Sequence, residues 1–385
     1  MDFGLTSEQQ MLVDSIRAFV EAELKPHEEE VERTNKVRPE LIQQIHAAAI
    51  KNGFYAANMP EELGGGGLDH VALTLMEREL GRTSFALQYA VARPSNILRA
   101  CQGEQVERYL LPAIRGERVE CLGLTEPNAG SDLRSMQTRA EADGDDFVIN
   151  GTKHFISYAD VADFIVLFAA SGVEETSKGA KKKITSFLVD KDTPGLDVRM
   201  GPHSVSHRGF HHSELVFNNC RVNKRQVLGE MHRGFDVANQ WLGATRLTVA
   251  AQCVGRAQRA MEMAAQWAAT RKQFGQTIGK FQGTSFKLAD MTTEIEAANL
   301  LCLQTAWKTD KGSGTDADYA MAKLYATEML ARVTDQTVQI FGGMGLMEEV
   351  GVERLWRDAR VERIWDGTSE IQRHIISRSV LRPLE

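Results

Sequence analysis

A carboxylate near the C-terminus is placed to act either in helix capping or in proton transfer. Asp366 lies in residues 364–372 (IWDGTSEIQ), directly before a Gly–Thr pair, and Ile371, Ile375 and Ile376 then follow a helical spacing. It either accepts hydrogen bonds from free backbone N–H groups at the helix start, or acts as a base beside an amide that polarises a substrate carbonyl. Caps are far commoner than catalytic bases, so the local pattern alone favours the cap.

Three other segments offer groups that suit a cofactor or a thioester ligand. Residues 124–132 (LTEPNAGSD) combine hydroxyls with turn amides, and residues 151–157 (GTKHFIS) add an aromatic ring and a serine. Such groups can bind a cofactor ring edge, although 124–132 alone is also compatible with an ordinary turn carrying an Asx cap. Arg271, in residues 271–275 (RKQFG), follows a predicted helix, where it complements the helix dipole or binds a pyrophosphate.

Metal and dinucleotide sites are not favoured. His203, His207, His211 and His212 have the spacing of metal ligands on a helix, but a Gly–Pro pair precedes them and Gly209 interrupts them. We therefore expect neither a helix nor a metal site there, and the role of the four histidines stays open. No G-x-G-x-x-G motif follows a strand and opens a helix, which argues against a dinucleotide-binding Rossmann unit.

Three regions of different hydrophobic texture must position these residues. Residues 1–118 carry apolar side chains at helical spacing, and residues 119–230 contain short β-rich runs between turns. The pairs Asp143–Gly144 and Asn150–Gly151 predict hairpin turns around residues 147–149. Helical spacing returns in residues 231–385 and suits an antiparallel bundle. The long helices predicted there cover residues 235–270, 282–311 and 316–341.

Composition and charge exclude several classes of protein. The 385 residues carry a net charge of −7, which gives no general attraction to nucleic acid or to anionic membranes. The five cysteines are scattered and include no C-x-x-C pair, as in proteins of a reducing compartment. No basic and apolar leader opens the chain, and no apolar run is long enough to span a membrane. We therefore expect a soluble, cytoplasmic protein that neither binds nucleic acid nor inserts into membranes.

Over essentially its whole length the chain resembles the acyl-CoA dehydrogenase family. The matching motifs are LTEPNAGSD, GTKHFIS, RKQFG, QIFGGMG (residues 339–345) and IWDGTSEIQ, in family order and at family spacing. The resemblance implies an α+β multi-domain fold with an N-terminal α-helical domain (1–118), a middle antiparallel β domain (119–230) and a C-terminal four-helix bundle (231–385). It also implies FAD, a homotetramer whose FAD sites are shared between subunits, an acyl-CoA substrate and electron-transferring flavoprotein as electron acceptor.

The resemblance assigns roles residue by residue. Phe155 stands where the family usually has a tryptophan against the flavin ring, and Gly130 and Ser131 lie where it binds flavin and acyl-CoA. Arg246 resembles an arginine that meets the CoA moiety; its alternative is an ion pair on the helix surface. Gly367 joins Ser131, Arg246 and Asp366 as a substrate contact. The other implied FAD contacts are Leu124, Thr125, Ser157, Thr368 and Glu370, together with Arg271, Phe274, Gln282, Gln339 and Gly343, which reach the FAD of a neighbouring subunit.

The implied reaction is the α,β-dehydrogenation of an acyl-CoA thioester to a trans-2-enoyl-CoA. Asp366 removes the Cα proton while a hydride leaves Cβ for flavin N5. The family usually has glutamate at this position, and some relatives place the base at the position of Thr245, where threonine cannot do that work. Aspartate reaches about 1.5 Å less far than glutamate. Either the local backbone lies closer to the flavin, or the preferred acyl group carries its Cα closer to residue 366. A branched, cyclic or otherwise bulky acyl group could do the second, so we expect such a group to be preferred over a straight chain.

Two other functions remain open. Flavin oxidases of the same fold, acting on acyl-CoA or on a nitroalkane, include relatives with aspartate at the base position. A non-catalytic or nucleic-acid-binding relative is opposed by the net charge and by the carboxylate at 366. Arg93 lies in a region that lines the family's acyl pocket, where it either packs its stem with its head in solvent or recognises a polar acyl tail.

Overall fold

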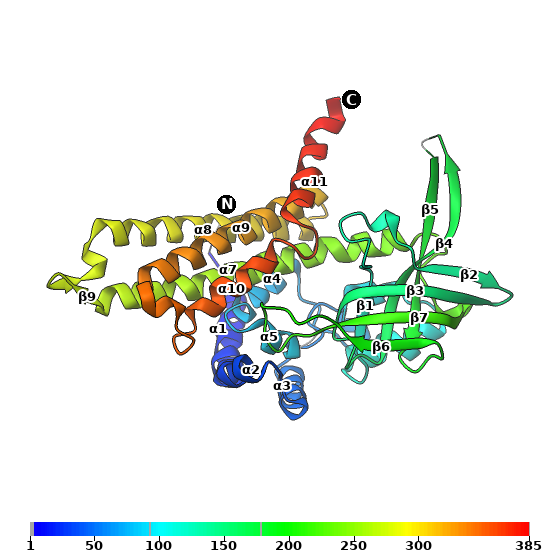
Figure 1. Ribbon diagram of the computed structural model, residues 1–385, viewed down its shortest axis with the longest axis horizontal. Coiled ribbons are helices and arrows are strands. Elements are labelled where there is room, and N and C mark those ends of the chain that lie inside the picture. The colour runs from blue at the N-terminus through cyan, green and yellow to red at the C-terminus, as the bar shows by residue number, and fades with distance from the viewer. Residues whose placement is uncertain (1–3, 92–93, 178, 385) are drawn as a thin grey trace.

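The computed structural model describes residues 4–91, 94–177 and 179–384 and shows three regions in chain order (Figure 1). Helices form the N-terminal region, a curled β-sheet forms the middle, and the chain then returns as long helices beside the first ones. The N-terminal helices are α1 (Ser7–Phe19), α2 (Glu28–Thr34), α3 (Pro39–Lys51), α4 (His70–Leu80), α5 (Phe85–Val91) and α6 (Leu111–Ile114).

Three long helices dominate the C-terminal region and agree with the predicted ranges to within a residue. Thr315 starts one of them with a capping box, because its hydroxyl accepts from the N–H of Asp318 while Asp318 binds back to the N–H of Thr315. The helices pack on one another, and α4 packs against both α7 and α8. Their bounds are α7 (Gly234–Thr270), α8 (Gln282–Asp310), α9 (Asp316–Phe341), α10 (Val352–Glu362) and α11 (Ser369–Leu381).

The middle region is an eight-stranded sheet that is not purely antiparallel. The strand order is β6-β7-β3-β2-β4-β5-β8, with β1 beside β4. Most strand pairs are antiparallel, as predicted. β1 and β2 run parallel to β4, and a long stretch of chain that includes β3 lies between each of them and β4. The strands are β1 (Glu120–Gly123), β2 (Arg139–Asp143), β3 (Asp146–Ser157), β4 (Phe164–Thr176), β5 (Gly179–Asp190), β6 (Leu196–Met200), β7 (His212–Asn223) and β8 (Val227–Leu228).

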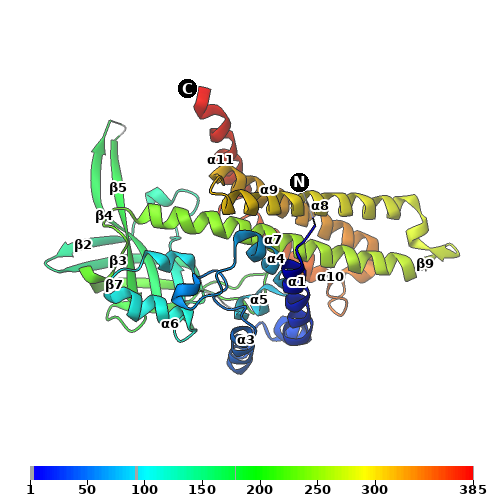
Figure 2. The same ribbon diagram turned by 180° about the vertical axis from the view of Figure 1, so that it is seen from behind.

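The centre of the sheet is buried on both faces. In β4 the side chains of Phe164, Val166 and Phe168 join the core of the N-terminal helices, and Ile165 and Leu167 join a second core on the other face. An unbroken apolar run is what a strand covered on both sides requires. Figure 2 shows α6 lying beside the sheet on the helical side. Among the described residues, no helix combines the length and apolar character that crossing a membrane requires.

The two Asx–Gly pairs have different fates. Asp143–Gly144 forms the turn between β2 and β3, as predicted. The hairpin predicted at Asn150–Gly151 is wrong, because this pair lies inside β3 at a break in its register with β7. Gly151 has a φ of 150°, and a Cβ there would lie 2.5 Å from Thr138 Oγ1. A glycine is therefore needed here because the backbone of residue 151 lies close to Thr138. The break in register with β7 comes before the part of β3 that carries Phe155 and Ser157.

Because of this contact, we expect even a methyl group at position 151 to destabilise the protein. Gly151→Ala should lower the free energy of unfolding by about 1–3 kcal/mol, the usual range for overpacking, because the methyl group meets Thr138. Gly283→Ala is the matched control, since a Cβ at Gly283 on α8 meets no atom within 4 Å. Thermal melts of both variants would test this, and equal melting temperatures would contradict the packing argument.

Candidate active site

Asp366 lies in a tight loop between α10 and α11. It adopts the left-handed conformation, with a φ of 52°, and Gly367 follows at 92°. The helix cap belongs to a different residue, because the Thr368 hydroxyl accepts from the N–H of Ile371 at 3.3 Å. The capping interpretation of Asp366 is therefore wrong, and its carboxylate remains available for other work.

Side chains from two helices hold the carbonyl groups of this loop. The ammonium of Lys323, on α9, donates to the carbonyl oxygens of Trp365 at 2.9 Å and Gly367 at 2.8 Å. Gln372, on α11, donates its amide to the carbonyls of Gly367 at 2.8 Å and Asp366 at 3.3 Å. The backbone N–H of Asp366 has no partner within the described ranges. A ligand carbonyl beside Asp366 would therefore find a free donor.

The surroundings of Asp366 raise the pKa of its carboxyl group. Burial raises the pKa to about 6, and the negative charge of Glu362 adds to the rise. The positive charges of Lys323 and Arg246 oppose it. The side chain is only partly exposed. A carboxylate with a pKa near 6 is ionised at neutral pH and more basic than an ordinary aspartate, as proton abstraction requires.

A buried ionic cluster anchors the residue before the base. Trp365 donates its indole N–H to Glu362 at 2.8 Å and stacks on the ring of His207, with ring centres 5.1 Å apart. Glu362 also binds the guanidinium of Arg256, on α7, and lies 3.2 Å from His207 Nε2. His207 receives a further contact from Asp358 on α10. Burial opposes the charge on His207, but the two carboxylates outweigh it and raise the pKa of the imidazole.

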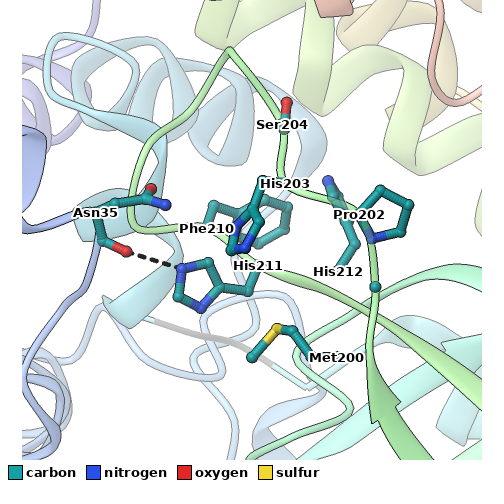
Figure 3. A pocket seen from close by; sticks show the side chains of 9 residues that line it. Asn35, Met200, Pro202, His203, Ser204, Phe210, His211 and His212 are labelled. Carbon is teal, nitrogen blue, oxygen red and sulfur yellow. Dashed lines mark hydrogen bonds between the residues drawn. The ribbon is translucent and has the colours of Figure 1, made fainter.

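The four histidines lie on no helix, and three of them, His203, His211 and His212, line a small pocket (Figure 3). His211 pairs with the carbonyl of Asn35 at 2.8 Å. His212 lies 3.4 Å from Ser157 Oγ, and burial, with neighbouring positive charge, lowers its pKa to about 4. The pocket lined by His203, His211 and His212 holds about 10 Å³, room for one water at most. No metal-binding cluster occurs among the described residues.

The predicted cofactor residues of the middle region lie together. Lys153, fully buried, donates to the carbonyl of Leu124 at 3.0 Å and to Glu126 at 2.8 Å, and the N–H of His154 binds the carbonyl of Thr125. These bonds hold residues 124–126 against β3. Phe155 leaves 55% of its surface exposed at a φ of 56°. Gly130 and Ser131 are also exposed.

This surface fits a planar cofactor. An aromatic ring with more than half its surface in solvent can cover an apolar ring, and the partly exposed side chains of Thr125 and Ser157 add hydroxyls. A Cβ at Gly130 would meet no atom within 4 Å, so a ligand can approach its backbone closely. Leu124, by contrast, is buried, so mainly its backbone would be available to a cofactor.

The second predicted cofactor group lies far from the first. Arg271 ends α7 beside a small hairpin, β9 (Lys272–Gln273) and β10 (Gln276–Thr277), at the end of the bundle remote from the sheet (Figure 1). Trp267 joins this group, because it stacks on Phe341 at 4.9 Å and lies under the guanidinium of Arg271 at 5.9 Å. Phe274 is 94% exposed. Gln282 begins α8 and Gln339 and Gly343 end α9 at the same end.

Arg246, Glu370 and Arg93 are predicted site residues with different settings. Arg246 is buried and forms no ion pair with any described residue, and its Nε has no hydrogen-bond partner, so the surface ion pair is wrong. Its charge acts on Asp366 and Asp316. Glu370 is exposed in the first turn of α11, where its own backbone N–H lowers its pKa. Arg93 lies outside the described residues.

Three positioning side chains escaped the sequence argument. Lys153, Lys323 and Gln372 are fully buried, and each binds backbone carbonyl oxygens. A weak signal exists for Lys323, which falls between Ala320 and Ala326 on the buried stripe of its helix. A lysine on an apolar stripe indicates a buried charge with partners, although sequence alone does not name them.

Comparison with known proteins gives matches along the whole chain. Models of the N-terminal, middle and C-terminal domains of acyl-CoA dehydrogenase match residues 6–117, 121–220 and 232–381. A probable acyl-CoA dehydrogenase of Bacillus subtilis is 38% identical, over 99% of this chain and 100% of that one. A 3-(aryl)acrylate reductase of Clostridium sporogenes is 36% identical, over 98% and 99%.

Similar proteins also include complexes and solved structures. A subunit of the caffeyl-CoA reductase–Etf complex of Acetobacterium woodii is 35% identical over 98% of this chain and 99% of that one. The structure of butyryl-CoA dehydrogenase from Megasphaera elsdenii has a TM-score of 0.90 at 34% identity, over 99% and 100%. An FAD complex of PigA has a TM-score of 0.88 at 27% identity, over 99% of both chains. With three domain models and relatives matched end to end, the chain belongs to the acyl-CoA dehydrogenase family of oxidoreductases.

Proposed function

We propose that this protein removes two hydrogens from the α and β carbons of an acyl-CoA thioester, with Asp366 as the base. The observation that carries the proposal is the state of Asp366: Thr368 rather than Asp366 caps the following helix, burial raises the Asp366 pKa to about 6, and the backbone N–H of Asp366 has no partner among the described residues. The N–H stabilises the developing enolate oxygen while the carboxylate takes the Cα proton. Bound FAD supplies the hydride acceptor for Cβ.

FAD is the cofactor that the exposed groups suit. Phe155, Thr125 and Ser157 are the groups for the flavin ring, with Gly130 and Ser131 beside it; Thr368 and Glu370 contribute from the base side. The hairpin group lies at the end of α7 remote from the sheet, whose strand β3 carries Phe155 and Ser157 (Figure 1). The separation supports sites shared between subunits, as in a homotetramer.

A wall of aromatic rings supports a non-straight acyl group. Phe85 and Tyr89, one turn apart on α5, contact Trp365 at 4.9 Å and Tyr158 at 4.2 Å between ring centres. Tyr158 follows Ser157 and Trp365 precedes Asp366, so the rings, which also pack around the buried Phe210, come from segments next to the proposed cofactor and base residues. All four rings keep part of their surface exposed. Offset and edge contacts with such rings favour a cyclic or aryl group, and two relatives are named for aryl substrates.

The electron acceptor that we propose is an electron-transferring flavoprotein in the cytoplasm. One relative is named as a subunit of a complex with Etf. Arg246 is buried and pairs with no acid that the structure describes, and we assign it as the substrate contact beside the base, together with Ser131 and Gly367. The use of an acceptor protein also distinguishes this function from that of an oxidase, because an oxidase transfers its electrons directly to oxygen.

Asp366→Asn tests the role of the base. The variant should retain FAD and bind acyl-CoA but lose turnover by several orders of magnitude, because only the proton acceptor is removed. Anaerobic flavin reduction by an acyl-CoA, followed by stopped-flow absorbance, gives the rate. Asp335→Asn, on the exposed side of α9, is the matched control. Near-normal flavin reduction in Asp366→Asn would falsify the mechanism, and rapid reoxidation of the wild-type flavin by air would favour the oxidase.

Arg271→Ala tests the cofactor group at the hairpin. Purified protein should carry about one FAD per chain, and the variant should retain less, because a charge-assisted contact to the pyrophosphate is lost. The neighbouring Lys272, also exposed, gives the control Lys272→Ala. FAD released by denaturation and measured by absorbance gives the occupancy. Equal occupancy in the two variants would contradict the assignment of Arg271.

A substrate panel tests the shape of the acyl group. Among straight, branched, cyclic and aryl acyl-CoAs, kcat/KM should be highest for a cyclic or aryl compound. The short side chain of Asp366 needs the Cα hydrogen close to it, and the four aromatic rings can pack against a ring of the substrate. Asp366→Glu should stay active and shift the preference towards straight chains. A straight-chain optimum in the wild type, or an unchanged ranking in Asp366→Glu, would remove the shape argument.

A further inference from the structure

Lys323 carries a charge in the interior of the bundle without a carboxylate partner in contact. Its side chain is fully buried, and no described acid forms an ion pair with it. Its hydrogen bonds instead go to the carbonyls of Trp365 and Gly367, at 2.9 and 2.8 Å. Burying an ammonium without a counter-ion in contact is costly, so the position calls for a reason beyond packing.

The two carbonyls lie on either side of the base. Binding both from one point bends the chain around Asp366 and matches its left-handed backbone, with a φ of 52°. This conformation is unfavourable for most residues with a side chain and persists only where the surroundings fix it. Gln372 assists from α11 with a neutral amide. The turn therefore has one charged and one neutral anchor.

The charge of Lys323 also acts on the carboxylate that the turn presents. Three charged groups face Asp366: Lys323 from α9, Arg246 from α7 and Glu362 from α10. The first two favour the ionised carboxylate, and Glu362 disfavours it. Burial lowers the pKa of Lys323 itself, while Asp366 and Glu362 oppose that change. Lys323 thus combines a geometric contact with a long-range electrostatic one.

We propose that Lys323 is a positioning residue for the reaction: its buried ammonium, bound to the carbonyls of Trp365 and Gly367, holds Asp366 in its left-handed turn and keeps the carboxylate ionised at neutral pH. The proposal rests on the proposed function of Asp366. A merely structural lysine would contribute to the stability of the bundle and leave the ionisation of the base unchanged.

Lys323→Met, which keeps the length and removes the charge, tests the proposal. In the wild type, kcat/KM should fall on the acidic side with a midpoint near pH 6, because the raised pKa of Asp366 leaves the base protonated below it. In Lys323→Met that midpoint should move to higher pH, since a favourable charge is gone. We expect kcat to fall at least tenfold while KM changes little.

Two control variants separate positioning, charge and folding. Thr327→Val removes a buried hydroxyl one turn further along α9, so it should lower the melting temperature without moving the pH midpoint. Gln372→Leu removes the neutral anchor, so it should lower kcat and leave the midpoint in place. If Lys323→Met does not fold, Lys323→Gln retains a neutral donor and should show the same shift of the midpoint.

The outcomes distinguish this proposal from the proposed function. Loss of turnover in Asp366→Asn together with a wild-type pH profile and kcat in the folded Lys323 variant would overturn the role of Lys323 alone. Full turnover in Asp366→Asn would instead remove the base, and with it both proposals. An unshifted midpoint with lowered stability, as in Thr327→Val, would show that Lys323 is structural only.

Discussion

A carboxylate sealed inside the protein, that of Glu362, sets the geometry around the base. Such a charge is tolerated only when it is paired and hydrogen-bonded, and its partners come from separate parts of the chain. Arg256 comes from α7, His207 from the segment between β6 and β7, and the indole of Trp365 from the base loop itself. The N-terminal helices join through Phe85, which packs on both His207 and Trp365. All three regions therefore meet one residue before Asp366.

The loop at residues 124–126 and the loop around Asp366, to which we assign the cofactor and the base, are held in the same way. On the cofactor side, Lys153 binds the carbonyl of Leu124 and the carboxylate of Glu126; on the base side, Lys323 binds two carbonyls. Irregular backbone inside a protein leaves carbonyl oxygens without secondary-structure partners, and a buried ammonium satisfies several of them from one point. Lys153 has Glu126 in contact, and burial still lowers its pKa to about 8. No acid in the described part of the chain contacts Lys323, so we infer that its charge acts on Asp366.

The sequence predicted periodic structure better than irregular structure. The long helices followed from apolar spacing because burial along one stripe depends on residue type at each position. The prediction of a hairpin at Asn150–Gly151 was wrong because an Asx–Gly pair also occurs where a glycine is needed for close packing. Only the approach of Thr138 distinguishes the two cases. Asp366 was found by motif, but its partners were not. Lys323 lies 43 residues earlier, and a lysine in a helix carries no local mark of the loop it binds.

The basicity that we propose for Asp366 results from several groups with opposing effects on its pKa. Burial and Glu362 push the pKa of Asp366 upwards, and Lys323 and Arg246 push it down, so the balance falls at about 6. A base with an ordinary aspartate pKa would be ionised but weak, and one raised well above 7 would be protonated at neutral pH. Glu362 cannot be removed to lower the pKa, because it holds Trp365, Arg256 and His207. The ammonium of Lys323 offsets that fixed negative charge, and this compensation makes an aspartate with raised basicity compatible with an ionised ground state.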